Sequence, residues 1–143
     1  WSLTYGCACG GYVSVQCLEP KFYAEFLGLM GLAGDPVFAA QNDPTQWPVQ
    51  TKMLAGLFAS QPREHWTAVF AGSDACVAPV LSPQEAARDP HMTARQTWTD
   101  AQGIRQPAPA PRFDGRARPP GPVPERGAHG PALRQELAER GLI

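Results

Sequence analysis

The sequence lacks a surplus of charge of either sign and lacks a long hydrophobic run. Its 12 basic and 13 acidic side chains leave a formal net charge of -1, which gives no positive field that would attract nucleic acid. Because no run of about 18 apolar residues occurs, we expect no membrane span. The chain begins at Trp1 without a methionine, a charged leader or an apolar leader segment, so we expect a fragment or a processed product.

The residue spacing of a metal site is also missing. Cys7 and Cys9 are separated by one residue rather than the two of a zinc knuckle, and the histidines at positions 65, 91 and 129 form no pair at helical spacing. We therefore expect reduced thiols, in a cytoplasmic protein, that are structural rather than catalytic. In particular, we interpret Cys76 as a small buried apolar side chain and Asp74 as a turn or cap residue.

The sequence does contain enough apolar residues for a core and an uneven supply of chain-breaking residues. In 143 residues, 43% are hydrophobic, and 16 prolines and 14 glycines occur. These values fit one compact domain followed by an extended part. We predict an α+β domain over residues 1–106, a proline-rich extended strap over residues 107–126, and an amphipathic helix over residues 127–143.

An alternating apolar run that ends at a carboxylate is the most informative stretch. In residues 12–17 the side chains of Val13, Val15 and Cys17 fall on one face of a predicted strand, so Glu19 follows the end of that strand. Pro20 lacks an N–H and suits the first turn of a helix, which we predict to run to Leu32. A negative charge at this junction faces the positive end of the helix.

The remaining predicted elements are short helices and short strands. Glycine and proline positions predict the element boundaries. The second helix is predicted to begin at either Pro44 or Pro48, but not to contain both prolines, because a proline four residues into a helix would break its hydrogen bonds. Its apolar face is predicted to include Trp47, Leu54 and Phe58. The predicted elements are strands at 3–5 and 76–81, helices up to 59, at 63–71, 82–88 and 89–95, and a hairpin of 96–99 with 104–106.

The strap and the last helix allow two interpretations. Seven prolines occur between Pro107 and Pro124, and such a segment runs extended, either as a ligand for a partner domain or as a strap over another domain. We favour the strap, because Ala132, Leu133 and Leu137 form the apolar stripe of a terminal helix that needs a surface to pack on.

A set of motifs runs across nearly the whole chain. They are Tyr5-x-x-Ala8-x-Gly10-x-Tyr12-Val, Leu18-Glu19-Pro-x-Phe-Tyr23, Trp47-Pro48, Trp66-x-x-Val-Phe-Ala-Gly-Ser-Asp74-Ala-Cys-Val-x-Pro-Val80, Pro90-His91, Arg95 and Pro109-Ala-Pro-Arg-Phe113. These motifs resemble the C-terminal part of the α-methylacyl-CoA racemases, which belong to the family III CoA-transferase (CaiB/BaiF-type) superfamily. Gly127 and His129 also fit the ending of that family.

The resemblance implies an enzyme that inverts the α-carbon of a 2-methylacyl-CoA thioester by 1,1-proton transfer through an enolate. Such chemistry needs two proton carriers on opposite faces and a site that stabilises the oxyanion. In the family these carriers are a histidine and an aspartate of the large N-terminal domain, which also holds most of the CoA site. Neither motif occurs in this chain. The resemblance therefore implies a coenzyme A thioester as substrate, no separate cofactor, and a chain that is inactive alone.

Glu19 is the candidate site residue that the resemblance assigns to this chain. In the family the matching glutamate hydrogen-bonds the catalytic histidine and orients it, a supporting role. The alternative is that Glu19 only caps the following helix. Two positions depart from the family pattern, since Cys9 replaces an aspartate and Trp1-Ser2-Leu3 replaces an aromatic-Tyr-Asp stretch.

The resemblance also implies partners. Family subunits interlock as rings, so we expect a homodimer or contact with an N-terminal-domain partner. A CoA transferase of the same superfamily is one alternative function. A non-catalytic module that binds another protein through the strap and the terminal helix is another. The racemase hypothesis predicts that the leucines of the last helix pack on nothing within this chain, whereas a helix packed on the chain's own core favours the binding module.

Overall fold

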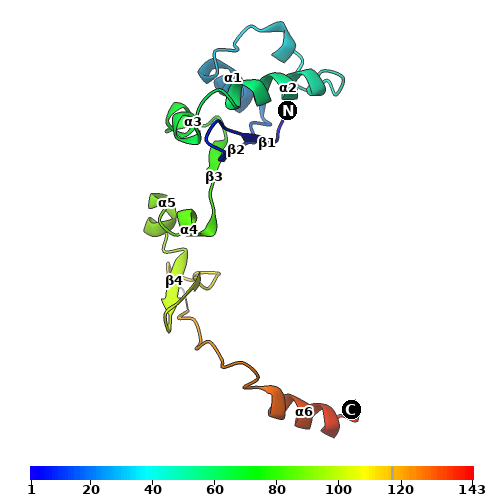
Figure 1. Ribbon diagram of the computed structural model, residues 1–143, viewed down its shortest axis with the longest axis vertical. Helices are drawn as coiled ribbons and strands as arrows, with labels where there is room; N and C mark the ends of the chain where they lie inside the picture. Colours follow the sequence, from blue (N-terminus) through cyan, green and yellow to red (C-terminus); the bar gives the residue numbers. More distant parts are fainter. Residues whose placement is uncertain (117) are drawn as a thin grey trace. The chain divides into compact units, whose positions relative to one another are not determined.

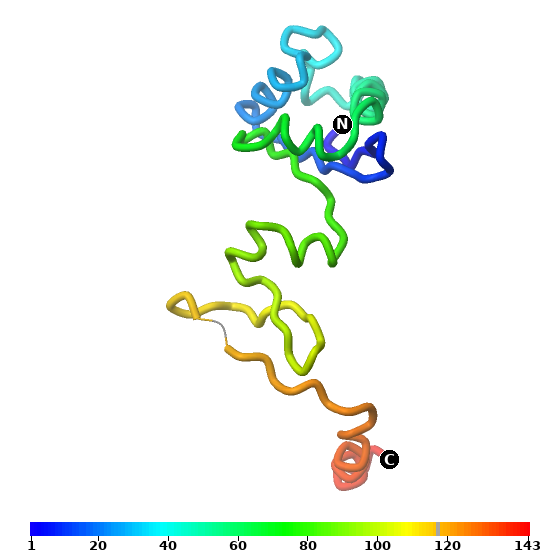
Figure 2. The backbone as a smooth tube through the Cα atoms, turned by 60° about the vertical axis from the view of Figure 1, so that its left-hand side comes forward, coloured from blue at the N-terminus to red at the C-terminus, as the bar shows by residue number. Residues whose placement is uncertain are grey.

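The computed structural model describes residues 1–116 and 118–143. These residues form two compact units, 1–82 and 83–143. In Figures 1 and 2 the first unit is coloured from blue to green and the second from green to red. Helices and small antiparallel sheets give the α+β fold that was predicted. The boundaries expected at residues 106 and 126 remain predictions. Among the described residues, no helix is long and apolar enough to cross a bilayer.

The first unit contains a three-stranded antiparallel sheet. Its strands are β1 (Thr4–Gly6), β2 (Tyr12–Val15) and β3 (Val77–Val80), in the order β1-β2-β3. In the central strand, Val13 lies opposite Tyr5 of β1 and opposite Pro79 of β3. Since proline has no N–H to donate, Pro79 fits the edge position of β3.

The first unit also contains helices, which cover the buried face of this sheet. They are α1 (Pro20–Leu29), the short 3-10 helix η1 (Pro36–Phe38), α2 (Trp47–Phe58) and α3 (Arg63–Phe70). Pro48 lies in the first turn of α2, so the later of the two predicted starts is correct. Asp43 instead closes a turn, because its Oδ1 accepts hydrogen bonds from the N–H of Thr45 at 2.9 Å and from its hydroxyl at 2.7 Å.

Aromatic side chains of the helices fill the core of the first unit. Phe26 and Phe58 are fully buried. The ring centroids of Tyr5 and Phe58 lie 5.1 Å apart, those of Phe58 and Trp66 5.0 Å, and those of Phe26 and Phe70 5.8 Å. These distances are typical of offset and edge-to-face packing. The core of the first unit is therefore built largely from aromatic rings.

The predicted faces of β2 are also confirmed. Val13, Val15 and Cys17 are buried, whereas Tyr12 and Gln16 are exposed. The alternation has period two because successive side chains of a strand point to opposite faces.

Two residues that were predicted to be buried lie at the surface. Trp47 is 41% exposed and its indole N–H donates to the carbonyl of Gln41 at 2.9 Å, because it precedes the buried stripe of α2, which begins at Gln50. Cys76 is exposed and has a φ of +51°. It occupies a left-handed position before β3, and the neighbouring Ala75 takes the buried place.

The second unit begins with two short helices and a hairpin. Its elements are α4 (Pro83–Ala86), α5 (Pro90–Ala94), β4 (Trp98–Ala101), β5 (Ile104–Pro107) and α6 (Gly130–Glu139). α4 ends earlier than the predicted Arg88. Asp89 caps α5, since its Oδ1 accepts the N–H of Met92 at 3.0 Å. Gln102 and Gly103 both have positive φ, which matches the tight turn of a two-residue hairpin.

The proline-rich segment contains little regular structure. Between β5 and α6, the described residues form no helix or named strand, and Phe113 and Arg116 make an isolated bridge. The terminal helix α6 carries exposed leucines, with Leu133 54% and Leu137 38% exposed. The apolar stripe predicted for this helix is therefore exposed within the second unit.

The aromatic core gives a stability prediction. Replacing Phe26 with alanine should lower the free energy of unfolding of the first unit by about 3 to 5 kcal/mol, because a large cavity remains in a close-packed site. Urea denaturation measures the loss. Phe113→Ala is the matched control, because Phe113 is 76% exposed and should change the stability little. Equal losses for the two variants would show that Phe26 does not pack as described.

Candidate functional site

Glu19 lies at the junction between β2 and α1, where the sequence predicted it. Its backbone is extended, with φ -72° and ψ 141°, and Pro20 follows in the first turn of the helix. Its carbonyl accepts the N–H of Tyr23 at 3.0 Å, the first hydrogen bond of α1. Glu19 therefore holds the N-cap position of the helix through its backbone.

The side chain of Glu19 does not cap α1. It is exposed and makes no capping hydrogen bond, although a side-chain oxygen at this position commonly accepts an N–H of the first turn. The capping alternative therefore has no hydrogen bond to support it. The carboxylate is available to a donor from outside this unit.

A groove lies next to this junction and shares Leu18 with it. The groove has a volume of about 380 Å³ and combines apolar walls with amide and hydroxyl groups. Its lining residues are Trp1, Ser2, Leu3, Leu18, Gln41, Asn42 and Trp47. Exposed aliphatic and indole surfaces with a few polar groups are typical of small-molecule sites.

Gln41 organises the groove, although no sequence motif points to it. Its backbone carbonyl accepts the indole N–H of Trp1 at 3.1 Å and that of Trp47 at 2.9 Å. Its side-chain amide donates to the carbonyl of Leu18 at 2.8 Å. One loop residue thus holds both tryptophans and the residue before Glu19. No local pattern indicates this role, because two of its partners, Trp1 and Leu18, lie 40 and 23 positions away.

Tyr23 supports the wall of the groove from the core side. The ring centroids of Trp1 and Tyr23 lie 4.8 Å apart, and the hydroxyl of Tyr23 donates to the carbonyl of Phe38 at 3.1 Å. Burial raises the pKa of Tyr23 to about 12. The phenol therefore stays protonated at neutral pH and acts as a structural donor rather than a base.

The cysteines lie in contrasting environments. All four are free thiols. The Sγ of Cys9 accepts the N–H of Arg63 at 3.3 Å, and backbone hydrogen bonds from Arg63 and Gly11 lower the pKa of the Cys9 thiol. Burial raises the pKa of Cys17 to about 12. Within the described part of the chain, no group of three or more His, Cys, Asp or Glu side chains is arranged to hold a metal ion.

Comparison with known proteins shows the family of the chain. The sequence profile of CoA-transferase family III matches residues 2–130. The chain belongs to CoA-transferase family III. Over 109 residues, this family III chain is 37% identical to α-methylacyl-CoA racemase of Mus musculus and 34% identical to that of Homo sapiens. Each alignment covers 76% of this chain and 28% of the relative, so the chain spans less than a third of the relatives' length.

Solved structures have the same fold. Rv3272 from Mycobacterium tuberculosis is similar with a TM-score of 0.59 and 19% identity, over 91% of this family III chain and 37% of that chain. A CAIB/BAIF family protein from Brucella suis gives a TM-score of 0.53 and 21% identity, over 94% and 36% of the two chains. At these identities the likeness supports the fold alone.

The thiol environments give a pH-dependent prediction. Because the Cys9 pKa is lowered, its thiolate should form below the ordinary thiol pKa of about 8.5, and iodoacetamide should modify it most readily as the pH rises towards that value. Cys17 should stay unmodified in the folded chain, since it is buried and protonated. Peptide mass spectrometry across a pH series measures both. Modification of Cys17 as fast as Cys9 would contradict the assignment.

Proposed function

We propose that this chain is the C-terminal part of an acyl-CoA racemase that acts on 2-methylacyl-CoA thioesters. The observation that carries the proposal is the carboxylate of Glu19, which is exposed at the β2–α1 junction and makes no capping hydrogen bond. The 37% and 34% identities to α-methylacyl-CoA racemases support the choice within the family.

The proposed reaction moves a proton between the two faces of one carbon. One carrier removes the α-proton of the thioester, an enolate forms, and a second carrier returns a proton to the opposite face. Both carriers, a histidine and an aspartate, belong to the N-terminal part of the enzyme, and the substrate's coenzyme A is the only cofactor-like group. This chain alone is therefore inactive.

Glu19 has a supporting role in this proposal. Its carboxylate accepts the distal N–H of the catalytic histidine, which fixes the tautomer and leaves the other ring nitrogen free to carry the proton. The groove beside Leu18 offers aliphatic and indole walls. Such walls suit the apolar part of a thioester more than its phosphates.

The remainder of the chain is proposed to hold the enzyme together. The strap and the exposed leucine face of α6, Leu133 and Leu137, would pack on the N-terminal domain, in the same subunit or in its homodimer partner. Exposed apolar stripes of this kind mark surfaces that another protein covers. A cytoplasmic location fits the four free thiols.

Hydrogen exchange at the α-carbon tests the proposal. Incubation of the chain with a 2-methylacyl-CoA in heavy water should give no deuterium incorporation, and addition of the N-terminal domain should restore it. In the restored complex Glu19→Gln should reduce the exchange rate by about 10 to 100-fold, the loss typical of removing a group that orients a functional histidine. Mass spectrometry of the thioester measures the incorporation.

The control is Glu64→Gln, an exposed carboxylate on α3, which should leave exchange unchanged. Exchange catalysed by the chain alone would overturn the assignment of both proton carriers to the missing domain. An unchanged rate for Glu19→Gln would overturn its role.

CoA transfer is the second candidate function. A Caenorhabditis elegans relative named as a CaiB/baiF CoA-transferase family protein is 28% identical over 101 residues. The restored complex can be given the thioester and a free carboxylic acid in heavy water. If CoA is transferred to the acid without α-deuterium incorporation, the result favours this function over racemisation.

A further inference from the structure

The second unit contains arginine as its only basic residue type, apart from histidine. Residues 83–143 include nine arginines and no lysine, whereas both lysines lie in the first unit. A guanidinium is a planar fork that matches a carboxylate or phosphate with two parallel hydrogen bonds, which an ammonium cannot do. The arrangement of these arginines is therefore informative.

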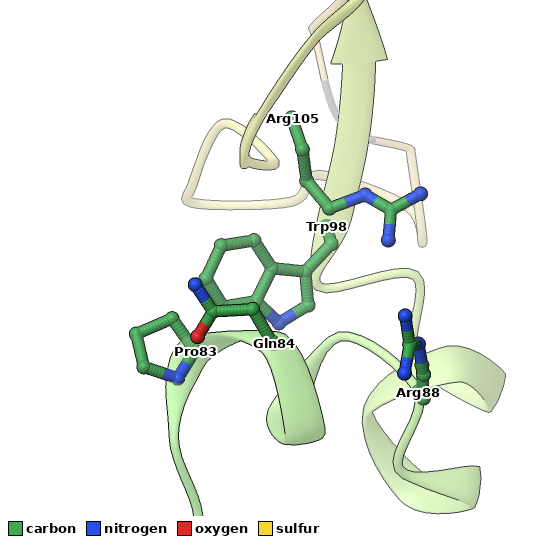
Figure 3. A pocket seen from close by; sticks show the side chains of 5 residues that line it. All are labelled: Pro83, Gln84, Arg88, Trp98 and Arg105. Carbon is green, nitrogen blue, oxygen red and sulfur yellow. The ribbon is translucent and has the colours of Figure 1, made fainter.

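A hollow of about 210 Å³ lies between α4 and the β4–β5 hairpin, and none of its residues belongs to the Glu19 site. Its lining residues are Pro83, Gln84, Arg88, Trp98 and Arg105. Figure 3 shows the indole of Trp98 beside Pro83 and Gln84, with Arg88 and Arg105 both extending on the other side of the ring. Trp98 is half-buried and both arginines are exposed.

The two arginines differ in what holds them. Nε and Nη2 of Arg105 donate to the carboxylate of Asp100 at 3.4 and 3.2 Å, which orients the guanidinium and leaves its remaining N–H groups free. Among the described residues, the guanidinium of Arg88 has no hydrogen bond or ion pair. Asp100 lines the neighbouring hollow, together with Trp98 and Arg105, but not this one. The hollow thus has two cations on its wall and no carboxylate.

We propose that this hollow binds a compact anion attached to a planar ring. The anionic group lies between the guanidiniums of Arg88 and Arg105, and the ring lies on the indole of Trp98. The amide of Gln84 is placed to hydrogen-bond an edge of the ring. A nucleoside monophosphate and an aromatic carboxylate both have this chemistry.

Size and charge each restrict the ligand. The hollow is smaller than the roughly 300 to 1,000 Å³ of pockets that enclose drug-sized ligands, so it suits one ring system and one anionic group. The guanidinium of Arg88, together with the N–H groups of Arg105 that Asp100 does not hold, favours an anion. The indole face distinguishes a ring-bearing anion from a simple one, since aromatic rings stack on indole.

Titration of the full chain with AMP and with nicotinate tests the proposal, followed by NMR of the Trp98 indole N–H. Either probe should shift this resonance saturably. The probe that binds more tightly shows whether the site prefers a phosphate or a carboxylate. Phosphate alone and adenosine alone should each bind about 10-fold more weakly than AMP, because each loses one half of the contacts. No saturable shift with either probe, or phosphate binding as tightly as AMP, would overturn the proposal.

Matched variants separate the site from general charge effects. Arg88→Gln should weaken binding of the tighter probe about 10-fold, whereas Arg134→Gln, which removes an exposed arginine from α6, should not. Unchanged amide resonances of the β4–β5 hairpin show that each variant is folded. Equal effects of the two substitutions would overturn the assignment. The test uses no thioester and no proton exchange, so its result is independent of the proposed function.

Discussion

The burial of one face of β2 is the constraint on which the first unit depends. Because side chains alternate along a strand, a shift of one residue would turn Val13 and Val15 to solvent and bury Tyr12 and Gln16 instead. Val13 and Val15 are 1% and 0% exposed, so the register is strongly specified. The same register fixes where the strand ends and the exposed Glu19 begins the helix. The position of the candidate site is therefore a consequence of core packing.

A second constraint ties the loop before α2 to this junction. Gln41 accepts from two indole N–H groups and donates to the carbonyl of Leu18. Hydrogen bonds to backbone groups contribute about 1 kcal/mol each, so their importance here is geometric rather than energetic. They keep Trp1 and Trp47 in the walls of the groove. The wall of the site is thus built from one loop and two segments that are distant in sequence.

The second unit differs from the first in what holds its elements in place. It has no buried large side chain among its described residues, and its short elements depend on caps and turns such as Asp89 and Gln102-Gly103. The ligand site that we propose for it lies beside Trp98, and its terminal helix exposes leucines. Its exposed leucines are the surface that we propose to pack on the N-terminal part of the enzyme.

The sequence by itself determined the order and type of most helices and strands, the α+β class, the buried face of β2 and the location of Glu19, because alternation, proline positions and caps act over a few neighbouring residues. Only the tertiary structure decided that Cys76 and Trp47 are exposed, that Gln41 organises a groove, and that arginines gather beside Trp98. These features depend on contacts between residues far apart along the chain, such as the hydrogen bond from Gln41 to Leu18 across 23 positions. No local pattern encodes which distant segments will meet.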